Sequence, residues 1–170
     1  MDTHTLTALA NKLLAALPHA VYEALKNHLV IVRLDQGAML FDADDEVDQI
    51  FFPLSGMVSL LVVLKNGSAI ETATVGREGV IGAMAGLGFH KSRVRAVIQL
   101  SGTVARIPAP QFRKLLAVNP AISSACIGYN EVLLAQARVT AACNISHAIE
   151  PRFCRWLLQS RDRAEAIRYR

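Results

Sequence analysis

The chain has 170 residues, of which 52% are hydrophobic and 19% are charged, so it can bury a core and is not a disordered protein. Its net charge of +4 arises in residues 151–170, because residues 1–150 carry 12 basic and 12 acidic side chains. This basic end could contact phosphate, or it could form a solvated helix face. The three cysteines are widely spaced, which excludes a disulfide framework and a C-x-x-C zinc site.

Apolar residues at helical spacing predict two short helices before residue 28. The first carries four leucines at spacings of three and four and is closed by Pro18, and the second spans Val21 to Leu25. The N-terminus has no basic region followed by an apolar core, so no signal peptide is expected. The longest apolar stretch, residues 121–143, is interrupted by polar and charged side chains, so we expect no membrane span and a cytoplasmic protein.

From Leu29 to Ile107 the pattern changes to short runs rich in β-branched and aromatic residues, separated by Gly and Asp turns. The runs cover residues 28–34, 39–41, 50–53, 57–64, 70–74, 93–100 and 103–107. Asn66–Gly67 predicts a type I′ hairpin turn, in which both residues have positive φ. This spacing of strands and turns is typical of an antiparallel sandwich or barrel.

The helical period returns after Pro108. Residues 111–118 are predicted to form one helix. Asn119 and Pro120 suit the N-cap and first position of a longer helix, which extends to about Asn144. Ser146 is expected to cap a third helix.

The long helix is apolar on most sides, since only Glu131 and Arg138 are charged between Pro120 and Asn144. One apolar stripe can cover the barrel while another meets the same helix of a second subunit. The homodimer interface is assigned to the stripe with alternating four–three spacing, which contains Ile122, Cys126, Tyr129, Leu133, Gln136 and Thr140. The second stripe contains Ile127, Leu134 and Ala141.

Several strings, in this order, resemble the CRP/FNR family of transcription regulators. Phe52–Ser59 is similar to its strand–turn–Gly segment, and Gly79–Met84 to its phosphate-binding cassette. Residues 104–120 resemble the approach to its dimerisation helix, and residues 152–163 its hinge helix. The resemblance implies an α+β, mainly β fold. This is a double-stranded β-helix or jelly-roll-like barrel, flanked by N-terminal helices and a long C-terminal dimerisation helix.

The same resemblance implies four segments. These are N-terminal helices over 1–27, a cyclic-nucleotide-binding-like barrel over 28–108, connecting and dimerisation helices over 109–145, and a hinge helix with a basic tail over 146–170. Family members continue with a helix-turn-helix that this chain is expected to lack, so DNA would be contacted only through that absent module. We expect the effector-sensing and dimerisation part of a regulator. The alternative is a stand-alone module that regulates a partner protein without binding DNA.

The resemblance also places an effector site at Gly82, Ala83, Met84, Ser92, Arg93 and Arg138. Nucleotide-binding members carry Glu where this chain has Ala83 and Arg near Ser92, and they contact the base near Ala137 and Arg138. Tight binding of cyclic AMP is not expected, because an unpaired ribose hydroxyl costs about 1–3 kcal/mol. The identity of the effector is left open.

Three basic residues after the cassette, Lys91, Arg93 and Arg95, could bind an anion or form a solvated strand face. No cysteine precedes Cys126, so an iron–sulfur cluster is not expected. His90 could ligate haem, although a surface loop histidine is the simpler interpretation. Cys126 and Cys143 could form a redox disulfide across a dimer or pack as small hydrophobes. No catalytic motif occurs, so neither an enzyme nor a metal site is expected.

Overall fold

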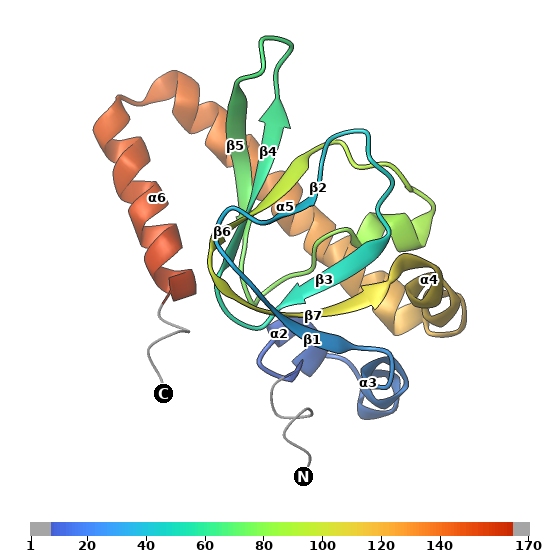
Figure 1. The fold of residues 1–170 in the computed structure, drawn as a ribbon. Coiled ribbons are helices and arrows are strands. Elements are labelled where there is room, and N and C mark those ends of the chain that lie inside the picture. The colour runs from blue at the N-terminus through green and yellow to red at the C-terminus, as the bar shows by residue number, and fades with distance from the viewer. Residues whose placement is uncertain (1–7, 165–170) are drawn as a thin grey trace.

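A computed structural model describes residues 8–164, and within them seven strands form two antiparallel sheets (Figure 1). One sheet has the order β1–β7–β3 and the other the order β2–β6–β4–β5. The mainly β fold with flanking helices is as expected. The strands are β1 (Val30–Leu34), β2 (Met39–Phe41), β3 (Gln49–Pro53), β4 (Met57–Val63), β5 (Ala69–Val75), β6 (Arg95–Leu100) and β7 (Gly102–Pro108).

The β4–β5 hairpin differs from the prediction. Gly67 has a φ of 83°, whereas Asn66 does not have positive φ, so the predicted type I′ turn is wrong. The Gly67 N–H donates to the Leu64 carbonyl at 2.9 Å, and the Leu64 N–H donates to the Ser68 carbonyl at 2.8 Å. This is a three-residue loop with its glycine in the left-handed region, the next most common hairpin connection.

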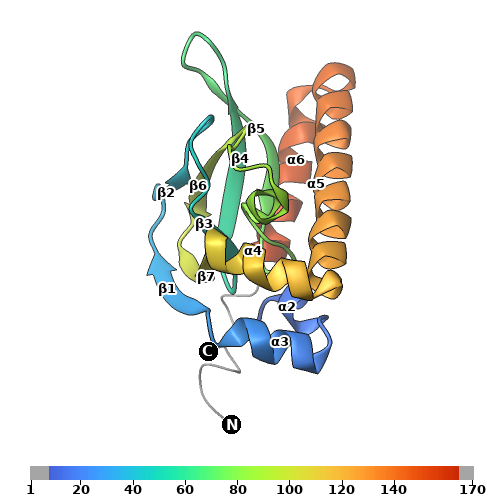
Figure 2. The same cartoon turned by 90° about the vertical axis from the view of Figure 1, so that its right-hand side faces the viewer.

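The helices lie at one end and along one side of the sheets, with α2, α3 and α4 at the end and α5 along the side (Figure 2). The 27 residues of α5 correspond to about 40 Å. From its far end α6 turns back along the barrel (Figure 1). The helices are α2 (Lys12–Ala15), α3 (His19–Lys26), η1 (Ala83–Leu87), α4 (Ala109–Val118), α5 (Pro120–Ser146) and α6 (Ile149–Ala164).

Asn119 is the N-cap residue of α5 and Pro120 is its first residue, as predicted, although the Asn119 side chain makes no cap bond to α5. Its Nδ2 donates instead to the Leu115 carbonyl at 3.0 Å, so it satisfies the end of α4. Ser146 is the last residue of α5 rather than the cap of α6. The division into four segments remains a prediction.

The first predicted helix is interrupted at Asn11, whose buried side chain connects three parts of the protein. Its Oδ1 accepts from the Leu14 N–H at 3.0 Å and caps α2. Its Nδ2 donates to the carbonyls of Pro53 at 2.9 Å and Gly79 at 2.8 Å. Because every polar group of this amide finds a partner, a buried Asn is tolerated here. It fixes the cassette against β3 and α2.

Candidate effector pocket

The cassette packs so closely against its neighbours that two of its positions require glycine. Gly82 has a φ of 80° at the start of η1, and a Cβ there would lie 2.8 Å from Val47 Cγ1. Gly79 lies directly against the ring of Tyr129 from α5, which leaves no room for a side chain. The Ile81 N–H donates to the Phe51 carbonyl at 2.8 Å and its carbonyl accepts from the Phe51 N–H at 3.0 Å. The cassette is thus pinned between β3 and α5.

A cavity of about 310 Å³ opens beside this segment, within the usual size range of small-molecule sites. We call it the cassette pocket. Its walls come from the cassette, the segment before β6, the barrel interior and the first half of α5, and most are apolar. They are formed by Phe41, Val47, Leu60, Val80, Ile81, Gly82, Ala83, Met84, Ala85, Phe89, Lys91, Ser92, Arg93, Val94, Cys126, Tyr129, Asn130 and Leu133.

Five of the six residues predicted for the effector site line this pocket together: Gly82, Ala83, Met84, Ser92 and Arg93. The sixth, Arg138, is exposed on α5 and does not line it. Ala83 is buried and its side chain carries no hydrogen-bonding group. The Ser92 hydroxyl is turned onto its own backbone, donating to the Val94 carbonyl at 2.7 Å and accepting from the Val94 N–H at 3.2 Å. These two positions therefore offer a ligand little polar recognition.

Two arginines near the pocket already face carboxylates. Arg95 donates to Asp42 through Nε at 2.9 Å and Nη2 at 2.6 Å, a bidentate pair. This pair lowers the pKa of the Asp42 carboxyl below its usual value. Arg93 Nη1 lies 3.6 Å from Asp44 Oδ1, with both side chains largely exposed. A highly charged anion would have to compete with these acidic side chains.

The burial of α5 side chains in the pocket wall corrects the predicted dimer interface. Ile122, Cys126 and Tyr129 are buried against the barrel within one protomer, so their side chains are not available to a second subunit. Burial raises the pKa of the Cys126 thiol to about 12, which makes it a packing residue at neutral pH rather than a reactive thiol. Burial also raises the pKa of Tyr129. The nearby Glu78 raises this pKa further, whereas Arg163 lowers it.

The other members of the predicted interface stripe also face inward. Leu133 packs partly buried against the core. Gln136 Oε1 accepts from the buried Thr74 N–H of β5 at 2.8 Å. Thr140 is half-buried. The stripe with four–three spacing is therefore the face that covers the barrel.

Several aliphatic side chains remain exposed on the parts of α5 that face away from the barrel. Ile127 is 51% exposed, Val132 57%, Leu134 39% and Val139 55%. Ile127 and Leu134 belong to the second stripe identified in the sequence. Ile127 and Leu134 are seven residues apart and form one apolar row, whereas Val132 and Val139 form a second row about 140° further around the helix. An exposed row of large aliphatic side chains is typical of a surface that pairs with another helix.

The sequence analysis missed Asn130 as a pocket residue. Asn130 is the only residue with an amide side chain in the first half of α5, and it lines the pocket. One polar residue in an apolar helix forms no pattern from which a binding role could be predicted.

His90 is exposed and its Nδ1 lies 3.0 Å from Arg113 Nη2. Along residues 8–164, no helix combines the length and apolar character needed to cross a bilayer.

The sequence matches the cyclic nucleotide-binding domain family over residues 31–119. No curated protein matches the chain significantly. Among solved structures, it resembles the c-di-GMP-responsive global regulator CLP of Xanthomonas campestris, with 16% identity and a TM-score of 0.69 over 82% of this chain and 70% of CLP. It resembles the sensor domain of the transcriptional regulator DNR of Pseudomonas aeruginosa, with 15% identity and a TM-score of 0.63 over 80% and 93%.

A third similar structure is the regulatory subunit of a cAMP-independent protein kinase A from Trypanosoma brucei. Its identity is 16% and its TM-score 0.62, over 77% of this chain and 50% of that subunit. The chain thus spans half of the kinase subunit's length. At these identities the likeness establishes the fold, and it confirms the jelly-roll-like architecture.

Proposed function

Since the chain belongs to the cyclic nucleotide-binding domain family, we propose that it is the effector-sensing and dimerisation domain of a CRP/FNR-like transcription regulator in the cytoplasm. One observation carries the proposal: the same turns of α5 line the cassette pocket on one side and expose an apolar row on the other. A ligand that contacts Tyr129 or Asn130 would shift the helix that pairs two subunits. DNA is then read by a helix-turn-helix module joined to this domain, and no catalytic step is involved.

The pocket favours an effector other than tightly bound cyclic AMP. Ala83 supplies no acceptor for a ribose hydroxyl, which costs about 1–3 kcal/mol when the hydroxyl is buried. Asp42 and Asp44 already face the nearby arginines. The apolar walls, with Asn130 as a neutral polar anchor, suit a mostly apolar ligand of low charge.

Differential ligand binding tests the sensing role. Thermal unfolding of the chain with cyclic AMP, cyclic GMP and c-di-GMP should show no large rise in Tm with cyclic AMP. A ligand at 100 times its Kd stabilises by about 2.7 kcal/mol, which is readily measured. A rise of that size with micromolar cyclic AMP, lost in Arg93→Gln, would contradict the proposed ligand preference.

The dimerisation role is tested on the exposed row of α5. Ile127→Glu with Leu134→Glu should convert the dimer to a monomer in sedimentation, because each carboxylate would be buried unpaired at the interface. Ala117→Glu, at an exposed position of α4, is the matched control, and this variant should remain dimeric. A wild-type chain that is monomeric at micromolar concentration would refute this part of the proposal.

The alternative function is that of a stand-alone module that regulates a partner protein without binding DNA. The kinase regulatory subunit has a similar fold. Sequence-specific retardation of DNA by the protein joined to its helix-turn-helix would support the regulator. Retention of a partner protein without DNA binding would support the alternative.

A further inference from the structure

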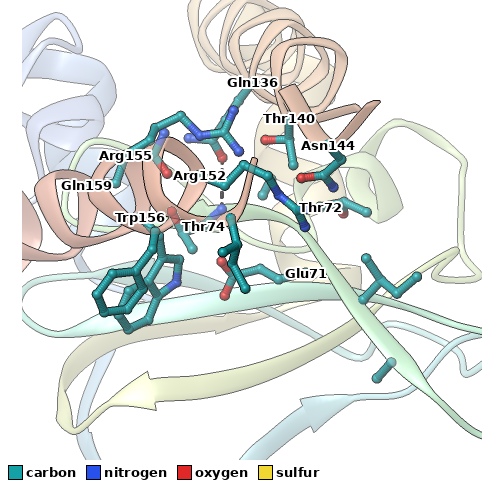
Figure 3. A pocket seen from close by; sticks show the side chains of 15 residues that line it. Glu71, Thr72, Thr74, Gln136, Thr140, Asn144, Arg152, Arg155, Trp156 and Gln159 are labelled. Carbon is teal, nitrogen blue, oxygen red and sulfur yellow. Dashed lines mark hydrogen bonds between the residues drawn. The ribbon is translucent and has the colours of Figure 1, made fainter. Parts of the chain in front are cut away.

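A second cavity of about 450 Å³ lies between β5, the second half of α5 and α6 (Figure 3). We call it the α6 cavity. None of its lining residues is shared with the cassette pocket. Its walls are Ala69, Ile70, Glu71, Thr72, Ala73, Thr74, Gln136, Thr140, Asn144, Ile149, Arg152, Phe153, Arg155, Trp156 and Gln159. Unlike the cassette pocket, it is rich in polar side chains.

Two arginines on one face of α6 dominate its charge. Arg152 and Arg155 are three residues apart, so they project from neighbouring turns of the same face, and Figure 3 shows them above β5. Among residues 8–164 neither is paired with a carboxylate. Arg155 Nη1 makes one long bond of 3.4 Å to the Val139 carbonyl. Guanidinium groups without carboxylate partners are suited to bind phosphate or carboxylate bidentately.

An unpartnered hydroxyl lies on the opposite wall. Thr74 is 2% exposed and its Oγ1 has no hydrogen-bond partner within the described residues. Its N–H is already bound by Gln136. A buried hydroxyl without a partner costs about 1–3 kcal/mol. Less than 1 Å² of this oxygen is accessible, so a polar group in the cavity would pair with it after a rotation of the Thr74 side chain.

The remaining lining residues define the rest of a ligand. Trp156 and Phe153 stack with ring centroids 6.3 Å apart and offer a flat aromatic surface. The amides of Gln136, Asn144 and Gln159 also line the cavity. Glu71 accepts a 2.5 Å bond from the Ser59 hydroxyl and places negative charge on the β5 wall, so the anionic end of a ligand must face α6.

We infer that the α6 cavity binds a small organic anion of about the size of a nucleoside monophosphate. Its acid group pairs with Arg152 and Arg155, its flat ring packs on Trp156, and a polar group meets Thr74 Oγ1. Such a ligand joins α6 to β5 and so reinforces the contact of Arg163 with Glu78 at 3.0 Å. This inference is independent of the ligand in the cassette pocket.

Calorimetry on the whole chain tests the site, with emission from its single tryptophan as a local readout. The probes are GMP, 2-naphthoate and inorganic phosphate. GMP carries a phosphate group and a ring, 2-naphthoate carries a carboxylate and a ring, and inorganic phosphate carries charge without a ring. GMP or naphthoate should bind and change Trp156 emission, and phosphate should bind more weakly. No heat and no emission change with any probe at millimolar concentration would overturn the inference and leave the cavity to solvent.

Three variants locate the binding. Arg152→Gln with Arg155→Gln should weaken the affinity at least about tenfold, the effect of one lost charge-assisted bond. Thr74→Val should weaken it about two- to tenfold, yet it should not lower the Tm of the free protein, because it removes an unpartnered hydroxyl. Arg93→Gln, beside the cassette pocket, should leave the affinity unchanged. Equal loss in Arg93→Gln, or a free-protein Tm that falls in Thr74→Val, would refute the site.

Discussion

The two halves of α5 are held to the barrel by different forces. The first half buries Ile122, Cys126 and Tyr129. It closes an apolar pocket beside which Arg93 and Arg95 face acids. The second half contributes Gln136 and Thr140 to a polar cavity whose arginines face no acid among residues 8–164. Apolar burial anchors a helix firmly, whereas isolated polar contacts add about 1 kcal/mol each. The first half is therefore suited to sense a ligand, and the second half is freer to move.

Ile122→Ala should have the largest effect on this arrangement. Loss of a fully buried Ile costs about 2–5 kcal/mol, because a cavity remains. Leu134→Ala, on the exposed face, is the control and should change the unfolding free energy of the monomer by less than about 0.5 kcal/mol. Urea unfolding at low protein concentration measures both. Equal losses would show that the two faces of α5 are packed alike.

Gln136→Ala should come next, in the second half. It leaves the buried Thr74 N–H without its acceptor, at a cost of about 1–3 kcal/mol. Gln136→Glu keeps an acceptor oxygen and should lose less. Hydrogen exchange at the Thr74 amide is the direct measurement, and protection that survives Gln136→Ala would contradict this role.

Arg163→Gln tests the attachment of α6. Arg163 pairs with Glu78 and also donates to the Thr74 carbonyl at 3.2 Å. Since the pair is partly exposed, its loss should cost about 1 kcal/mol or less, and less still at high salt. Faster hydrogen exchange throughout α6, with unchanged exchange in β3, is the expected pattern. Arg33→Gln, at an exposed position of β1, is the matched control.

The smallest effect on stability is expected from the titration of Asp42, near the cassette pocket. Hydrogen bonds from Arg95 lower the pKa of Asp42 in the folded protein. Its contribution to stability is therefore present above the unfolded pKa of about 3.9 and is lost as pH falls through the lower folded value. Asp42→Asn should flatten the stability profile in that acidic range only. A profile that changes near neutral pH would contradict the assignment.

The order and position of most elements follow from local signals in the chain, which are the strand and helix periods and the Gly and Pro turns. The cassette resemblance also placed Gly82, Ala83, Met84, Ser92 and Arg93 in one region. Two local predictions failed for local reasons. Asn66 lies in a longer loop than its dipeptide indicates, and Ser146 ends α5 instead of capping α6.

The stripe of α5 that faces the barrel is set by long-range packing. A helix that is apolar on most sides has no polar face to point at solvent, so spacing alone cannot choose between its two stripes. The pairing of Arg95 with Asp42 and of Arg163 with Glu78 joins residues 53 and 85 positions apart. The α6 cavity likewise exists only because α6 turns back onto β5, a contact between segments that no local pattern specifies.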